Sequence, residues 1–345
     1  WGDSDVEGHD TASWVSDLRY LRELTAGVEG IRIRFCVSGG SYWKNMLGNA
    51  AAREKFAAQI AEKLSAYDAL LDGVDLDFEW LYQGDSLWNG YGALAEAIRE
   101  KIGPDSVFTI TLHTVAYWFP KDKIQFVDFF PFQNYGPSTG AGTYDTMVSA
   151  CRSFRAWGYP DSKIQLSGPF YAVTGMANAG DALLYRDLKG EEEINNPALD
   201  QLILNLNGKK YYYNGVDTTR RKNKYISDQK LAGFMYWDLG GDISDSNNES
   251  NYFDQRSLLR AANRYVSSTS FPVTASPFCL SRVGASVPAA GGTVKVDVQM
   301  EEEALGWVVA ERPEWISVSA ASGIGRTTVI LTAAENKSVA GRSGT

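Results

Sequence analysis

The chain has 345 residues, of which 44% are hydrophobic and 22% charged, and its formal net charge is −9. The acidic surplus argues against nucleic acid as a partner, because a protein that binds phosphates needs a basic surface. No apolar run approaches the ~18 residues that a membrane span requires, and the length favours one large domain followed by a smaller module.

Apolar runs and amphipathic helical patterns alternate over residues 1–266. Strands are predicted over residues 30–38, 71–80, 106–114, 126–135, 163–171 and 231–239. Helices are predicted over residues 12–24, 50–70, 91–102, 143–157 and 254–266. Such alternation is typical of parallel strands covered by helices, so the fold class is α/β.

These six strands are two short of a closed (β/α)8 TIM barrel. A helix precedes the first of them, so the missing pair is expected to precede Trp1. A doubly wound open sheet is the alternative. It is disfavoured because no glycine-rich phosphate-binding turn follows the first strand.

A different pattern begins after a polar stretch at residues 267–270. Short alternating runs at residues 293–298, 315–318 and 327–331 are separated by turn signals at residues 291–292 and 322–325. This pattern predicts a small β-sandwich over residues 271–345, whose last strand is interrupted at the end of the sequence.

An acidic run in the second predicted strand carries the chemistry. Because side chains alternate along a strand, Asp75, Asp77 and Glu79 share one face, about 7 Å apart. Three neighbouring carboxylates repel one another, which raises the pKa of at least one of them. A carboxyl that stays protonated near neutrality can act as a general acid. Glu79 lies at the carboxyl end of the strand, where barrel active sites are found.

Two other interpretations of this acidic run fit less well. A calcium loop needs glycine at its sixth position and lacks alternating bulky apolar residues, and a solvated acidic edge would not bury every second residue. His9 and His113 are the two imidazoles, and no cysteine spacing matches a zinc site, so neither a metal nor an organic cofactor is expected. Cys36 lies in an apolar strand and is predicted to be a small buried hydrophobic residue.

The run DGVDLDFE resembles the DGxDxDxE signature of glycoside hydrolase family 18, the chitinases and endo-β-N-acetylglucosaminidases. Ser38-Gly39-Gly40 is similar to the family's SxGG motif, which marks its third strand, and Gln133-Asn-Tyr135 to its conserved tyrosine strand. Residues 168–171 resemble the strand-seven motif and residues 233–242 the last-strand GxMxWxxxxD motif. The resemblance covers about residues 12–266 and agrees with two missing strands.

The resemblance implies a retaining mechanism in which the substrate's own 2-acetamido group is the nucleophile. Glu79 would protonate the leaving oxygen and later activate water. Asp77 would bind the acetamido N–H and stabilise the oxazolinium ion, and Asp75 would share a proton with Asp77. Tyr135 would hold the acetyl carbonyl, and Trp237 would form the floor beneath the reacting sugar. Asp72 lies off this face and is expected to be structural.

Gln133, Met235, Trp80 and Tyr171 are further candidates for substrate contact. Two positions depart from the usual chitinase pattern, since Gly136 stands where an Asp is usual and Trp80 where a Tyr is common. The Gln-x-Tyr form is similar to plant-type chitinases and to several endoglycosidases that act on N-glycans. Residues 172–230 leave room for a helix and a loop but not clearly for an inserted domain, which predicts a shallower, endo-acting cleft.

The expected function is chitinase-like endo-hydrolysis of GlcNAc-β-1,4 linkages by a monomer whose partner is a carbohydrate. One alternative is an endo-β-N-acetylglucosaminidase that cleaves the chitobiose core of N-glycans. Another is a catalytically inactive lectin, although such proteins typically lack the acid glutamate.

The C-terminal stretch resembles the BACON module, a β-sandwich frequent in carbohydrate enzymes of Bacteroidetes. The matching residues are Trp315-Ile-Ser-Val318, Ser322-Gly323, residues 327–331, Asn336 and Arg342. The resemblance implies a secreted, periplasmic or cell-surface enzyme. Whether the module binds sugar or acts as a spacer is left open.

Overall fold

The computed structural model describes residues 12–26, 28, 30–38, 43–135, 142–173, 182–188, 203–206, 209–243, 254, 256–263, 278–280, 285–300, 304–338 and 340–344. The chain divides into two compact units. One comprises Trp1–Gly8 and Arg32–Pro272, and the other comprises His9–Ile31 and Val273–Thr345. The predicted boundary at residues 266–271, the polar stretch before the sandwich, and the motif residues Gly39, Gly40 and Gly136 lie outside the described residues.

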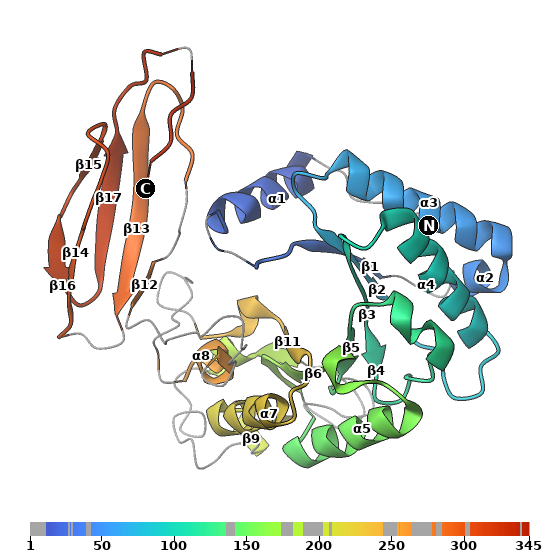
Figure 1. Cartoon of the computed structure of the whole chain (residues 1–345). Coiled ribbons are helices and arrows are strands. Elements are labelled where there is room, and N and C mark those ends of the chain that lie inside the picture. Colours follow the sequence, from blue (N-terminus) through green and yellow to red (C-terminus); the bar gives the residue numbers. More distant parts are fainter. Residues whose placement is uncertain are drawn as a thin grey trace. The chain divides into compact units, whose positions relative to one another are not determined.

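The first unit is built on parallel strands that follow one another in chain order (Figure 1). Their bounds are β1 Arg34–Ser38, β2 Gly73–Asp77, β3 Val107–Ile110, β4 Leu112–His113, β5 Phe130–Gln133, β6 Ile164–Pro169 and β11 Gly233–Trp237. One sheet has the order β1-β2-β3, the other has the order β4-β5-β6-β11, and a parallel bridge between Thr109 and Phe129 joins them. Each of the six predicted strands is present, β3 and β4 forming the third. Within the described residues β1 and β11 have no partner on their outer edges, so these strands do not close a ring.

Helices cover the outer face of this array (Figure 1). They are α2 Trp43–Gly48, α3 Ala50–Ala66, α4 Trp88–Ile102, α5 Tyr144–Trp157, α7 Val216–Asp228 and α8 Leu258–Asn263. Helix α3 begins where the Asn49 side chain accepts a hydrogen bond from the Ala52 N–H, and α5 begins where Thr143 accepts one from Thr146. Helices α4 and α5 end at Gly103 and Gly158, whose φ angles of 72° and 126° suit glycine.

The face of β2 opposite the acids packs into the core beneath these helices. Val74 and Leu76 are 0% exposed, and Phe78 is 4% exposed. The Phe78 ring stacks on Trp43 and Tyr91, at centroid distances of 5.2 and 5.5 Å. This packing fixes which way β2 faces, so the alternate residues point to the inner side of the array.

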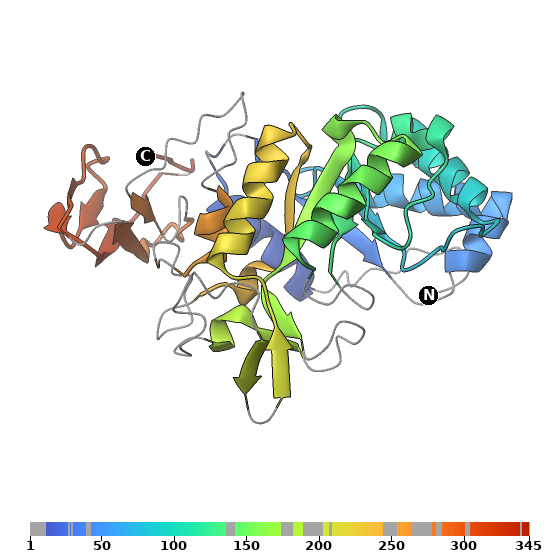
Figure 2. The ribbon, with the colours of Figure 1, turned by 90° about the horizontal axis from the view of Figure 1, so that it is seen from below.

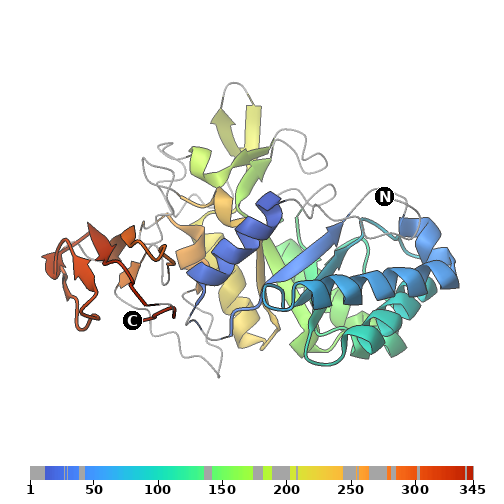
Figure 3. The same ribbon diagram turned by 90° about the horizontal axis from the view of Figure 1, so that it is seen from above.

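An antiparallel sheet is inserted between β6 and α7, where sequence analysis expected a helix and a loop. Its strands are β7 Tyr171–Val173, β8 Ala182–Leu184, β9 Ile203–Leu206 and β10 Lys209–Tyr212, in the order β8-β7-β10-β9. Figures 2 and 3 show this sheet projecting beyond the parallel strands. The expected helix is α7, and the structure adds a small sheet where sequence analysis found no clear room for an inserted domain. The argument for a shallow, endo-acting cleft therefore loses its premise.

The second unit contains helix α1 Ala12–Leu24 and short antiparallel strands. These are β12 Phe278–Leu280, β13 Gly292–Met300, β14 Gly306–Val308, β15 Ile316–Val318, β16 Ser322–Ile324 and β17 Thr327–Ala333, in sheets β12-β13-β17-β15 and β14-β16. A small core forms around Val298, Met300 and Val329. Residues 322–325 were predicted to be a turn, but most of them form β16, because Ser322 and Gly323 pair with Val308 and Trp307. The resemblance to a BACON module stays a prediction.

Candidate active site

Asp75 and Asp77 line the inner side of β2, and Glu79 follows two residues beyond the end of the strand. Burial, followed by the charges of Asp75 and Glu79, raises the pKa of Asp77 to about 8. Burial also raises the pKa of Glu79, against an opposing hydrogen bond from Gln133. The row therefore contains a carboxyl that stays protonated at neutral pH beside a second one that is harder to ionise than usual.

Strand β5 brings Gln133 onto this row. The Gln133 amide Nε2 lies 3.3 and 3.4 Å from the two Asp77 carboxyl oxygens and 3.4 Å from Glu79 Oε1. An amide NH₂ can donate two hydrogen bonds, so one side chain holds two of the acids together. Gln133 is 8% exposed, which shields these long contacts from water. Gln133, which was predicted to contact substrate, therefore also contacts Asp77 and Glu79.

Tyr135 and its neighbours form an aromatic wall next to the acids. The Tyr135 hydroxyl lies 3.3 Å from Met235 Sδ, and its ring meets Tyr171 edge to face at 5.9 Å. Burial raises the pKa of Tyr135 well above its usual value, and the charges of Asp77 and Glu79 raise it further. Tyr135 is therefore a neutral hydrogen-bond donor over the working pH range. Tyr135 follows the end of β5, Met235 lies in β11 of the parallel array, and Tyr171 lies in β7 of the inserted antiparallel sheet.

Trp237 is the last residue of β11 and Trp80 lies three residues beyond the end of β2, and the two rings have different environments. Trp237 is 59% exposed, an unusual exposure for so large an apolar side chain, and its ring is open to a planar ligand. Trp80 packs against His113, with ring centroids 4.6 Å apart. The peptide bonds Glu79–Trp80 and Trp237–Asp238 are both cis.

His113 was considered in the sequence only as a possible metal ligand, and its position in the site was missed. His113 Nε2 lies 2.9 Å from the Tyr135 carbonyl oxygen, and its Nδ1 lies 3.2 Å from the Val115 N–H. The backbone N–H can only donate and the carbonyl can only accept, so the ring is neutral with its proton on Nε2. Burial lowers the pKa of His113, which favours the same neutral form. Its register partner on β5 is Gln133, a relation visible only once the strands are paired.

Cys36 is a correction to the sequence analysis, because its side chain is exposed rather than buried. Cys36 pairs in register with Asp75 and therefore points to the same inner side, and its Sγ lies 3.6 Å from Asp75 Oδ2. Strand β1 has no partner on its outer edge within the described residues, which leaves this side open. Thr109, Thr111 and Arg34 also surround Asp75 and were not predicted.

Two further aspartates of the motifs are structural. Asp72 Oδ2 accepts a hydrogen bond from the Ile33 N–H at 2.6 Å, which ties β2 to the segment before β1 as expected for a supporting role. Asp242 accepts hydrogen bonds from the Ser257 hydroxyl at 2.7 Å and from the Leu258 N–H at 2.8 Å. Asp242 therefore fixes the start of α8 rather than contacting substrate.

Among the described residues, no three or more His, Cys, Asp and Glu side chains gather in a way that could hold a metal ion. None of the helices described is both long and apolar enough to cross a membrane.

Residues 3–242 match the sequence model of the family "Glycosyl hydrolases family 18". Chitinase A1 of Niallia circulans is 24% identical over 281 aligned residues, a match that covers 59% of this chain and 40% of that protein. The chain thus spans less than half the length of this relative.

Solved structures share the fold at low sequence identity. A chitinase from Bacteroides thetaiotaomicron has a TM-score of 0.61 at 20% identity, covering 76% of this chain and 84% of its own. A mutant of catalytic domain 2 of Group II chitinase from Ostrinia furnacalis, in complex with penta-N-acetylchitooctaose, has a TM-score of 0.61 at 17% identity, covering 76% and 85%. A family 18 N-acetylglucosaminidase from Paenibacillus barengoltzii has a TM-score of 0.56 at 19% identity, covering 76% and 89%. The fold is of the TIM-barrel type, and the chain belongs to the glycosyl hydrolases of family 18.

Proposed function

We propose that this chain is a retaining, chitinase-like glycosidase that hydrolyses GlcNAc-β-1,4 linkages by substrate-assisted catalysis. The observation that carries the proposal is the row of Asp75, Asp77 and Glu79 on one side of β2, with the pKa of Asp77 raised to about 8. Glycosidic cleavage needs a carboxylic acid that protonates the leaving oxygen, and neighbouring groups that stabilise the cationic transition state. This row offers both at the carboxyl end of a barrel-type strand, the usual place for catalysis.

Glu79 is the acid in this proposal. Its proton passes to the glycosidic oxygen while the acetamido carbonyl oxygen of the same sugar attacks C1, so the glycosidic C–O bond breaks as the oxazolinium ring closes. The Glu79 carboxylate then takes a proton from water, whose oxygen attacks C1 and reopens the ring. Two displacements at C1 retain its configuration. Burial raises the pKa of Glu79, which supports its role as the proton donor in the first step.

Asp77 and Tyr135 hold the acetamido group in this proposal. Asp77 accepts the acetamido N–H, and the cation that develops there favours the ionised form of Asp77 as the ring closes. The neutral Tyr135 hydroxyl donates to the acetyl carbonyl oxygen. The exposed Trp237 ring lies beneath the sugar, and Met235, Tyr171 and Trp80 line the site around it.

Chitin-type polymers are the favoured substrate because two of the three solved relatives above are described as chitinases. Cleavage within the chitobiose core of N-glycans is the second candidate, favoured by the Gln133-x-Tyr135 form. An inactive lectin is disfavoured because the acid glutamate and both aspartates are present together. The same proposal includes three further points. The partner is a carbohydrate, the enzyme is a monomer, and the enzyme is exported.

The test is mass spectrometry of products after incubation with GlcNAc oligomers and, in parallel, with a high-mannose glycoprotein. Short GlcNAc oligomers in the mass spectrum, whose new ends 1H NMR during the reaction shows to form first as the β-anomer, would support the proposal. Asn left with a single GlcNAc would support the second candidate instead. The matched control is Glu79→Gln, which keeps the shape of the side chain but cannot protonate the leaving oxygen, and should be slower by roughly 10²- to 10⁴-fold. Near-normal turnover in this variant would overturn the assignment of the acid.

A further inference from the structure

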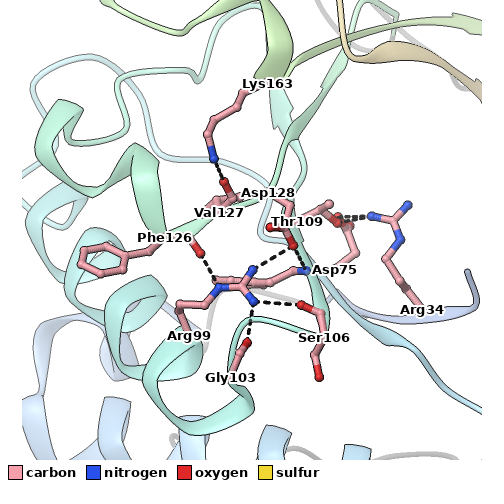
Figure 4. Close-up of polar contacts among 11 residues, drawn as sticks. Arg34, Asp75, Arg99, Gly103, Ser106, Thr109, Phe126, Val127, Asp128 and Lys163 are labelled. Atoms are coloured by element: carbon pink, nitrogen blue, oxygen red, sulfur yellow. Dashed lines mark hydrogen bonds and ion pairs between the residues drawn. The ribbon is translucent and has the colours of Figure 1, made fainter. Parts of the chain in front are cut away.

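Asp75 is held by a chain of hydrogen bonds whose direction can be worked out. Arg34 Nη1 contacts Thr109 Oγ1, and Thr109 Oγ1 contacts Asp75 Oδ1 (Figure 4). A guanidinium can only donate, so Thr109 accepts from Arg34. The single hydroxyl hydrogen of Thr109 is then free to point at Asp75, and Thr109 donates it to Asp75 Oδ1.

The second oxygen of Asp75 is also surrounded by donors. The Thr111 hydroxyl lies 2.8 Å from Asp75 Oδ2, and Cys36 Sγ lies 3.6 Å from the same oxygen. When both oxygens of a carboxyl group accept hydrogen bonds, the group has no partner for a proton of its own. Hydrogen bonds donated to the charged form of the group favour that form. The surroundings of Asp75 therefore suit an anion.

Arg34 supplies the positive charge for this arrangement. Its Nη1 lies 3.9 Å from Asp75 Oδ1, and the two side chains are 26% and 13% exposed. The guanidinium also lies over the Phe129 ring, 5.2 Å from the centroid, which holds it in place on the inner side of β1. A partly buried ion pair of this kind is screened less by solvent than a surface pair.

We propose that Arg34, acting through Thr109, is a positioning residue that holds the Asp75 carboxyl as a hydrogen-bond acceptor, so that the proton of the acid row rests on Asp77. This inference rests on the proposed function only where it predicts the effect of Arg34 on the rate of hydrolysis. Among the described residues, Cys36, Asp77 and Tyr91 also interact electrostatically with Asp75, and these three groups carry no positive charge. The raised pKa of Asp77 agrees with a proton resting there.

The first test reads the protonation states directly, without a substrate. The full chain is labelled with [13Cγ]aspartate, and carboxyl resonances are assigned from the Asp75→Asn and Asp77→Asn variants. At pH 7 the Asp75 resonance is expected at a carboxylate shift and the Asp77 resonance at a protonated shift. In Arg34→Gln both are expected to move toward intermediate values, whereas Arg34→Lys should keep the original pattern. Unchanged resonances in Arg34→Gln would overturn the proposal.

A second variant covers the case in which Arg34→Gln fails to fold. Thr109→Val has nearly the same shape and removes the hydroxyl that donates to Asp75 Oδ1, so the same movement of both resonances is expected. No movement in Thr109→Val would refute the role of the relay.

Kinetics separate this proposal from the proposed function. On GlcNAc oligomers, Arg34→Gln is expected to lower kcat by roughly 10- to 100-fold with little change in KM, and to move the pH optimum. A lower kcat at an unchanged pH optimum would indicate a merely structural role and overturn the inference. If the unaltered chain cleaves no GlcNAc substrate, the proposed function fails, while the resonances still decide the role of Arg34.

Discussion

Asp77 is expected to reduce folding stability at neutral pH, so that Asp77→Asn should stabilise the chain. The pKa of Asp77 rises from 3.8 to about 8 on folding, through burial and the charges of Asp75 and Glu79. Between these two pH values the folded chain therefore binds more protons than the unfolded chain. Stability must fall as the pH rises through this window, and the full cost is reached above the folded-state pKa.

The size of the effect follows from the same two values. Each pKa unit corresponds to about 1.4 kcal/mol, so the cost at pH 7 is at most about 4 kcal/mol. Neighbouring charges contribute to the shift of Asp77, so part of this cost belongs to the row as a whole and not to Asp77 alone. We therefore expect Asp77→Asn to raise the free energy of unfolding at pH 7 by about 2 kcal/mol. The asparagine keeps an oxygen that can accept from Gln133.

Urea unfolding at pH 4 and pH 7 measures this directly. The gain in Asp77→Asn should be present at pH 7 and small at pH 4, because pH 4 lies close to the unfolded-state pKa of 3.8 and little of the difference in bound protons has yet developed. Asp105→Asn is the matched control, because Asp105 is exposed and the same substitution there should change neither value. An equal gain at both pH values, or none at pH 7, would refute the reasoning.

Three further substitutions have separate expected results. Gln133→Met removes the amide that contacts Asp77 and Glu79, and should lower kcat/KM on GlcNAc oligomers by roughly 10- to 100-fold. Trp237→Ala removes an exposed ring and should raise KM about tenfold with a smaller change in kcat, which steady-state kinetics would show. Asp242→Ala leaves the Ser257 hydroxyl and the Leu258 N–H without their acceptor, and should lower the free energy of unfolding by about 3 kcal/mol in urea titrations. Values near those of the unaltered chain would contradict each expectation.

The acidic row could be predicted because its information is local. Alternation along one strand decides which side chains share a face, and buried Val74 and Leu76 fix the orientation. The ends of β2 were predicted less accurately, because a strand was predicted over residues 71–80 and the observed strand covers Gly73–Asp77. Phe78 shows why, because this residue is buried in the core although it lies beyond the paired residues of the strand. An apolar pattern in the sequence indicates which residues are buried, and the buried residues extend beyond those that are hydrogen-bonded to a neighbouring strand.

The groups around Asp75 could not be predicted because they come from distant segments. Arg34 and Thr109 are 75 residues apart in the chain, and no local period relates them. The exposure of Cys36 depends on which strands pair with β1, which its own apolar neighbours do not reveal. The inserted strands β8, β9 and β10 have three or four residues each, too few for an alternating pattern to be distinguished from a loop.

The environment changes along the acidic row, and this change accounts for the different roles that we propose for Asp75, Asp77 and Glu79. Asp75, at the inner end, accepts from Thr111 at 2.8 Å and has Arg34 at 3.9 Å, so its negative charge is compensated. The Gln133 amide reaches Asp77 at 3.3 Å, too weak a contact to offset burial between two acids, and the proton rests there. Glu79 is the most exposed of the three and is the one that a substrate can reach. Hydrogen-bond donors around Asp75, burial around Asp77 and exposure at Glu79 give this row three environments, and these fit the three roles that we propose.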